Sequence, residues 1–161
     1  YTPSAGELTA GSVTLTLHTS GNGTCNEETD NVTYTYTPAP TVDAGIAQTL
    51  CGNNADASLS GAVTVATGGI WSGGLGPFSP NVNALNATYS PDPSEITGGS
   101  VVLTLSSTGN GLCSQVSDNV TLTYSVIPTA NAGSDVTRCA NNAAVTLAGS
   151  VTVATGGLWS G

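Results

Sequence analysis

Apolar and polar residues alternate in two stretches near the start of the chain, and both patterns predict half-buried β-strands. In residues 12–19, SVTLTLHT, the side chains of Val13, Leu15 and Leu17 fall on one face. Residues 31–37, NVTYTYT, alternate in the same way. The Gly-Asn-Gly run at 21–23 is typical of a tight turn, because both residue types tolerate positive φ.

The middle of the chain predicts further short strands. Residues 46–51 read as an edge strand and residues 85–89 as a short strand, while 68–69, two glycines, read as a turn before Ile70-Trp71. Ala57, Leu59, Val63 and Val65 are expected to share one apolar face. A β-bulge is expected at Gly61, where this pattern is interrupted. Helical periodicity is not sustained anywhere, so the pattern predicts an all-β fold.

The same pattern returns after 88 positions. Residues 1–73 and 89–161 align without a gap, and more than half of the aligned positions are identical. The runs VTVATGGIWSG (63–73) and VTVATGGLWSG (151–161) are the clearest match. A fixed period of this length is typical of tandem repeats of one folding unit.

Proline-containing connections divide the repeats. We place boundaries at Pro40 and Pro128, because proline cannot donate to a sheet ladder and stiffens a connection. This predicts three units: residues 1–39 are the C-terminal half of a repeat, 40–127 a complete repeat, and 128–161 the N-terminal half of the next. We expect the chain to be a fragment of a longer protein.

Short strands separated by Gly, Pro and Asn turns predict an Ig-like β-sandwich for each 88-residue repeat. In that fold Trp71 and its counterpart Trp159 are expected as core aromatics where two sheets meet. The alternative is a carbohydrate-binding module in which Trp71 stacks on a sugar. The two readings differ in whether Trp71 is buried or exposed beside a groove.

Charge excludes several functions. The chain has one Arg (Arg138), no Lys and ten acidic residues, with a net charge of −9. Such a chain cannot neutralise phosphates, which argues against nucleic-acid partners, and an anionic membrane surface would repel it. No stretch approaches the roughly 18 apolar residues of a membrane span, so no membrane insertion is expected. The lack of Lys also rules out Lys–Asn isopeptide bonds.

Each repeat carries two cysteines, and an even number in a Lys-poor, secreted-looking chain predicts disulfides. With a boundary at Pro40, Cys51 and Cys113 share one unit and are expected to pair. Cys25 and Cys139 would then pair with residues outside the fragment. The alternative pairs Cys25 with Cys51 and Cys113 with Cys139. Loop-closure entropy separates the two arrangements by only about 1 kcal/mol. The proline-containing linker at Pro40 therefore favours the Cys51–Cys113 pairing.

No credible active site is present, and we expect no enzymatic activity and no cofactor. His18, the only histidine, is Ser106 in the other copy, so neither a catalytic triad nor a zinc site recurs. The Asp-Asn pairs at 30–31 and 118–119, with Asp43, are candidate calcium ligands. Too few acidic groups are close in sequence for the six to eight oxygens that calcium takes, and turn capping is favoured. No metal site is therefore expected.

The run from 67 to 125, with its WSGG, FSP, ATYSP and STGNGLC elements, resembles repeats of the SprB-like gliding-motility adhesins of the Bacteroidetes. The resemblance spans both copies. It implies an extracellular cell-surface filament that is exported by type IX secretion and moved by the gliding machinery.

These observations together predict a structural and adhesive repeat of a long cell-surface filament, an adhesin stalk. Its partners would be neighbouring repeats of the same chain and a surface polysaccharide. Besides the carbohydrate-binding module, the alternative is an accessory domain of a secreted hydrolase.

Overall fold

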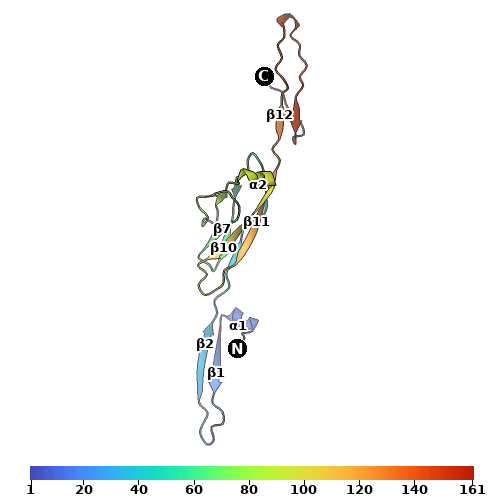
Figure 1. Ribbon diagram of the computed structural model, residues 1–161. Helices are drawn as coiled ribbons and strands as arrows, with labels where there is room; N and C mark the ends of the chain where they lie inside the picture. Colours follow the sequence, from blue (N-terminus) through green and yellow to red (C-terminus); the bar gives the residue numbers. More distant parts are fainter.

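The computed structural model describes residues 1–161 as an elongated, mostly β molecule (Figure 1). Strands hold 37% of the residues and helices 9%, which confirms the β class at this coarse level. Three parts follow one another along the long axis: an N-terminal ribbon, a central body and a C-terminal ribbon (Figure 1). None of its helices is long and apolar enough to cross a bilayer.

The N-terminal ribbon, residues 1–37, contains helix α1 (Ala5–Ala10) and strands β1 (Ser12–His18) and β2 (Thr29–Thr35). The strands are antiparallel, with Ser12 opposite Thr35 and His18 opposite Thr29. The first strand lies where the alternation predicts it. The second begins and ends two residues before the predicted range 31–37, because pairing with β1, rather than the apolar pattern alone, sets its limits.

The central body, residues 41–125, is built on a four-stranded sheet in the order β4-β11-β10-β7. These strands are β4 (Gln48–Cys51), β7 (Gly68–Ser72), β10 (Ser100–Thr108) and β11 (Ser117–Ser125). Neighbours are antiparallel except β4 and β11, which run parallel. Strand β4 lies at the sheet edge, as predicted for residues 46–51. Strands β10 and β11 pair in the register of β1 and β2, 88 positions later.

Two small sheets accompany the large one. Strand β3 (Thr41–Asp43) pairs with β6 (Ala62–Thr64), and β9 (Thr88–Tyr89) lies between β5 (Ala57–Ser58) and β8 (Phe78–Ser79). The core forms where the apolar faces of β7, β10 and β11 meet these strands and the loops beside them. Its buried residues are Ala44, Ala57, Leu59, Trp71, Ala87, Tyr89, Leu103, Leu105, Val120, Leu122 and Tyr124.

The C-terminal ribbon, residues 129–161, has little regular structure. Strands β12 (Thr129–Asn131) and β13 (Ser150–Thr152) pair, and a 3₁₀ turn, η1 (Ala140–Asn142), lies at the far end. The pairing of β12 with β13 matches that of β3 with β6. The counterparts of β4, β5 and β7 are not strands here, which follows because the strands they would pair with are absent from this part of the molecule.

The chain also contains two short helices, which the absence of a sustained helical period did not reveal. Helix α1 and helix α2 (Pro93–Gly98) each have six residues, too few for a 3.6-residue apolar period to show. Their sequence signal is a capping box: the side chain of Asp92 accepts from a helix amide, and Glu95 accepts from the amide of Asp92 at 2.8 Å. Ser4 and Glu7 do the same in α1.

Two local predictions around β6 and β7 are also wrong. Val65 does not share the buried face of Leu59; it is half exposed, with φ of 65°. Gly68 and Gly69 do not form a turn but open strand β7. An ideal Cβ on Gly69 would lie 2.9 Å from methyl carbons of Leu105 and Leu85, so the missing side chain makes room for the core.

Candidate functional sites

Trp71 lies at the centre of the core and is only 2% exposed. Its Nε1 donates to the carbonyl oxygens of Ala84 and Leu85, at 3.1 and 3.2 Å. Its ring stacks on Phe78 with 6.4 Å between ring centroids. Both the ring and the N–H of Trp71 are therefore used inside the protein, and no ring face is available to a sugar.

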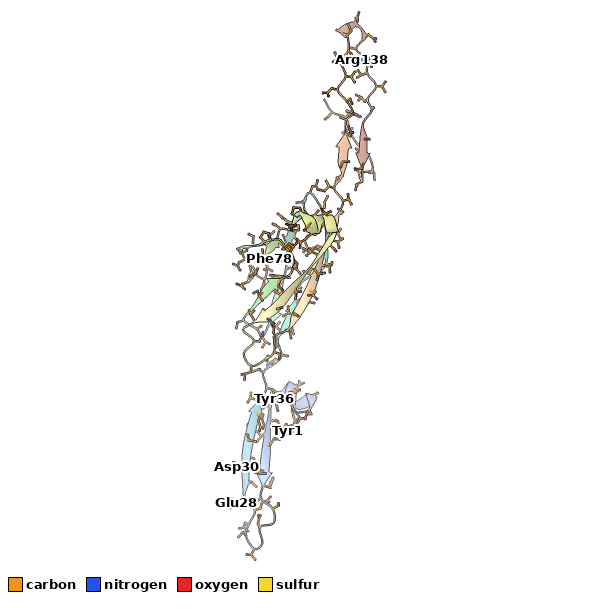
Figure 2. The ribbon with its side chains drawn as sticks, in the orientation of Figure 1. Tyr1, Glu28, Asp30, Tyr36, Phe78 and Arg138 are labelled. Carbon is orange, nitrogen blue, oxygen red and sulfur yellow. The ribbon has the colours of Figure 1, made fainter.

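A cluster of Phe78, Tyr89 and Glu95 continues this core toward helix α2; Figure 2 marks Phe78 in the central body. The rings of Phe78 and Tyr89 lie 4.9 Å apart, and the Tyr89 hydroxyl donates to Glu95 Oε2 at 2.6 Å. Burial, and secondly the hydrogen bond to Glu95, raise the pKa of Tyr89 to about 12. Tyr89 therefore stays neutral and acts as a hydrogen-bond donor at physiological pH.

The same cluster holds the loop that follows β7. The amide of Leu75 donates to Glu95 Oε1 at 2.9 Å, and the amide of Gly76 donates to the Tyr89 hydroxyl at 3.0 Å. A buried carboxylate is thus satisfied by backbone and phenol donors rather than by a cation. This arrangement positions a loop, and it holds no nucleophile.

Sequence reasoning missed this cluster, although a signal was present. Tyr89 and Glu95 return as Tyr1 and Glu7, each pair enclosing a capping box. In the N-terminal ribbon the hydrogen bond to Glu7 raises the pKa of Tyr1 to about 12, although Tyr1 is largely exposed. A tyrosine six residues before the glutamate of the capping box is therefore the sequence pattern that could have predicted this cluster.

The predicted disulfide between Cys51 and Cys113 is wrong: all four cysteines are free. Cys51 lies opposite Ser125 at the end of β11, whereas Cys113 precedes Ser117 at its start. Eight steps of strand, about 26 Å, separate Ser117 from Ser125. A disulfide needs Cα atoms within about 7 Å, so the two thiols lie at opposite poles of the central body.

The other two cysteines also form no disulfide. Cys25 and Cys139 are both exposed. Cys113 lies against the connection to the N-terminal ribbon, with its sulfur 3.5 Å from Thr37 Oγ1 and 3.7 Å from the carbonyl oxygen of Pro38. The position of the proline connection shows that Cys51 and Cys113 belong to one unit, but it does not show where the two thiols lie along the strands.

The acidic residues that are candidate calcium ligands accept hydrogen bonds from backbone amides in turns and loops. Asp43 Oδ1 accepts from the amide of Gly45 at 2.8 Å, and Asp118 Oδ2 accepts from the amide of Ala44 at 2.9 Å. That backbone hydrogen bond, with a second one to Asn119, lowers the pKa of Asp118. His18 Nδ1 lies 2.6 Å from Glu27 Oε1 on the exposed ribbon. No three His, Cys, Asp or Glu side chains gather as a metal site would require.

The two ribbons expose residues whose counterparts are core residues of the central body. Trp159, expected as a core aromatic, is 50% exposed, because no strand pairs beside it as β10 pairs with the β7 strand that carries Trp71. Leu17 is 76% exposed, whereas its counterpart Leu105 is fully buried. The ends of the molecule thus carry apolar surface that the central body buries.

These features define a mostly β protein whose best-organised side-chain clusters serve packing and loop positioning. Comparison of the chain with protein-family models and with curated proteins finds no match.

Proposed function

We propose that this chain is part of an array of Ig-like β-sandwich domains that forms the stalk of an extracellular adhesin. In this proposal residues 40–127 are one complete domain, and 1–39 and 128–161 are halves of its neighbours. The observation that carries it is the end-to-end arrangement of the three parts, with the chain entering the central body at one end and leaving at the other (Figure 1). Repetition of such a unit adds length with every copy.

Local structure supports this division. The β1–β2 and β10–β11 pairs share one register, and the β3–β6 and β12–β13 pairs share another, each 88 positions apart. The connections at 38–40 and 126–128 are short and contain proline, which restricts their backbone. Short, stiff connections keep successive units extended.

The surface chemistry suits an exposed filament. A net charge of −9 keeps a long protein soluble and disfavours non-specific contact with anionic surfaces. One Arg and no Lys leave a single cleavage site for trypsin-like proteases. The resemblance to gliding-motility adhesins adds the specific proposal of a type IX-secreted, cell-surface protein, with surface polysaccharide as a partner.

Antibody fragments raised against the 161-residue chain test the proposal. They should label intact source cells, and monovalent fragments should reduce attachment of those cells to a surface. Fragments against a periplasmic protein provide the control and should do neither. Recovery of the antigen only after lysis, or free in the medium together with hydrolase activity, would contradict the adhesin and favour the accessory-domain alternative.

A further inference from the structure

Two loops of the molecule make the same turn around an Asn-Gly pair. In the loop between β10 and β11, residues 110–113 form a turn in which the amide of Cys113 donates to the carbonyl oxygen of Asn110 at 3.1 Å. Residues 22–25, between β1 and β2, repeat this hydrogen bond at 3.0 Å. Only the second residue of each turn, a glycine, has positive φ, at 62° and 61°. This is the type II′ pattern, which favours glycine at that position.

The backbone nitrogen of each glycine is free. No backbone hydrogen bond involves the amide of Gly111 or of Gly23. Both glycines are exposed, and an ideal Cβ on either one would meet no atom within 4 Å. Water and the side chain of the preceding asparagine therefore have open access to both nitrogens.

The side chain of each asparagine is loosely held. Nδ2 of Asn110 donates to the carbonyl oxygen of Ser107 at 3.4 Å, and Nδ2 of Asn22 donates to that of Thr19, also at 3.4 Å. Most N–H···O hydrogen bonds are shorter, at roughly 2.7–3.2 Å. Oδ1 of Asn110 is buried without a donor, which raises the free energy of this orientation. Rotation of the carboxamide toward the next residue therefore costs little.

We propose that Asn110 and Asn22 are self-modification sites, at which the nitrogen of the following glycine attacks the side-chain carboxamide and water completes the conversion to aspartate or isoaspartate. At Asn110 the nitrogen of Gly111 forms a bond to Cγ and gives up its proton. The bond between Cγ and Nδ2 breaks, and Nδ2 leaves as ammonia with that proton. The product is a cyclic succinimide.

Water then opens the succinimide ring at one of its two carbonyl groups. Breakage of the bond between Cγ and the Gly111 nitrogen leaves aspartate with the original main chain. Breakage of the bond between the backbone carbonyl carbon and that nitrogen leaves isoaspartate, in which the main chain runs through Cγ. The net reaction consumes water and releases ammonia, so it needs no oxidant or reductant.

The remaining asparagines lack this arrangement, because a residue with a side chain follows each of them. Asn53 precedes Asn54, whose amide donates to the carbonyl oxygen of Cys51 at 2.9 Å. Asn119 precedes Val120 inside the paired strand β11. A side chain on the following residue shields the attacking nitrogen, and pairing holds the backbone in place. The reaction is therefore confined to the two turns.

The fold itself preserves the reactive pair, since the second position of the turn needs a residue that tolerates positive φ. Each conversion adds one negative charge to a chain that already carries −9. The loop of Asn110 lies against the connection to the N-terminal ribbon, where Cys113 Sγ is 3.7 Å from the carbonyl oxygen of Pro38. The new charge, and in isoaspartate the longer main chain, therefore appear where the central body meets the ribbon. The inference does not depend on the proposed function.

Peptide mass spectrometry of the purified full chain, sampled during incubation at physiological temperature and pH, tests the proposal. Pepsin releases the peptides, because the chain offers trypsin a single Arg and no Lys. Asn110 and Asn22 should gain the mass of an amide-to-acid conversion, and a protein isoaspartyl methyltransferase should label part of the product. Asn53 and Asn119 serve as controls in the same molecule and should stay unchanged.

Two variants identify the attacking atom. Gly111→Ala crowds the attacking nitrogen and should slow conversion of Asn110 by at least about tenfold, which corresponds to about 1.4 kcal/mol on the barrier. Asn110→Gln keeps the glycine and the turn but requires a larger ring, so residue 110 should remain unmodified. Asn22 should convert at the wild-type rate in both variants, which also provides an internal clock for each sample.

Three results would overturn the proposal. The folded chain could keep both asparagines unchanged while the same chain in urea converts them, which would show that the folded turns protect the pair. Asn53 or Asn119 could convert as fast as Asn110. Gly111→Ala could convert Asn110 at the wild-type rate while keeping the wild-type circular-dichroism spectrum, which would exclude attack by the Gly111 nitrogen.

Discussion

At the residue scale, the unusual backbone at Val65 recurs at Val153. Both have positive φ, 65° and 66°, which a β-branched residue rarely adopts. The residue after each one donates its amide to the residue before it: Ala66 to the carbonyl of Thr64, and Ala154 to that of Thr152, both at 2.7 Å. This is a strained γ-turn, and its recurrence shows that local sequence, rather than the surrounding body, produces it.

Relief of this strain should stabilise the protein. Val65→Asn places a residue that tolerates the left-handed region at an exposed position, so we expect the free energy of unfolding to rise by about 1 kcal/mol. Urea unfolding followed by circular dichroism measures it. Val126→Asn, also exposed but without positive φ, should change stability by less than about 0.5 kcal/mol. A loss of stability in Val65→Asn would contradict the strain argument.

Two buried tyrosines should make the fold sensitive to alkali. Burial, with a smaller contribution from nearby carboxylates, raises the pKa of Tyr89 and of Tyr124 to about 12, from the ordinary value of 10.0. The folded state then holds protons that the unfolded state releases. Stability is therefore complete below pH 10 and falls as the pH rises from 10 toward 12.

Tyr124→Phe isolates this effect, because the Tyr124 hydroxyl is buried without a hydrogen-bond partner. Removing the hydroxyl should reduce the loss of stability between pH 10 and pH 12, measured by urea unfolding at each pH. An unchanged pH dependence in Tyr124→Phe would show that this tyrosine does not titrate with unfolding.

At the element scale, the β10–β11 pair organises the central body. It carries five of the eleven core residues and gives both neighbouring strands their partners. The segments that pack on this pair are short strands and loops, and they approach the pair closely at glycines. Gly61 is an example: an added Cβ would lie 2.7 Å from a Leu105 methyl carbon and 3.0 Å from Trp71 Cζ2.

Gly61→Ala should therefore destabilise the protein by about 1 to 3 kcal/mol, the usual cost of overpacking a core. Thermal unfolding measures the change. Gly98→Ala is the control, since a Cβ there meets no atom within 4 Å and alanine favours the helix. Introducing Leu105→Ala should lower the stability less in the Gly61→Ala background than in the wild type. Strictly additive losses of stability would contradict the proposed contact.

At the scale of the whole molecule, the position of the two connections determines how the central body carries tension. The chain enters before β3 and β4 and leaves after β11, and β4 runs parallel to β11 with Gln48 opposite Leu122 and Cys51 opposite Ser125. Tension between the two connections therefore pulls the β4–β11 hydrogen bonds along the strands, so that they must break together. This geometry suits an element of a stalk.

Force spectroscopy tests the directional effect. Pulling through handles at positions 40 and 127 should unfold the central body at higher force than pulling through positions 40 and 111, which peels β4 from β11 one bond at a time. Forced unfolding reports the unfolding rate, so both geometries are compared at one loading rate. Equal forces in the two geometries would contradict this role of the β4–β11 pair.

The sequence by itself determined the β class, the period of 88 residues, the first strand, the edge strand at 46–51 and the burial of Trp71. These features depend on side-chain alternation, turn residues and repetition, all of which are local or directly countable. The two short helices could also have been predicted from their capping boxes, although not from apolar periodicity.

Only the tertiary structure decided which cysteines lie near each other and which apolar faces are covered. Cys51 and Cys113 share a repeat, yet β11 holds them at opposite poles. Leu17 and Leu105 have the same sequence pattern, yet one is exposed and the other buried. Alternation tells which side of a strand is apolar, but burial and proximity depend on strands brought together from distant parts of the chain, and no local pattern encodes that.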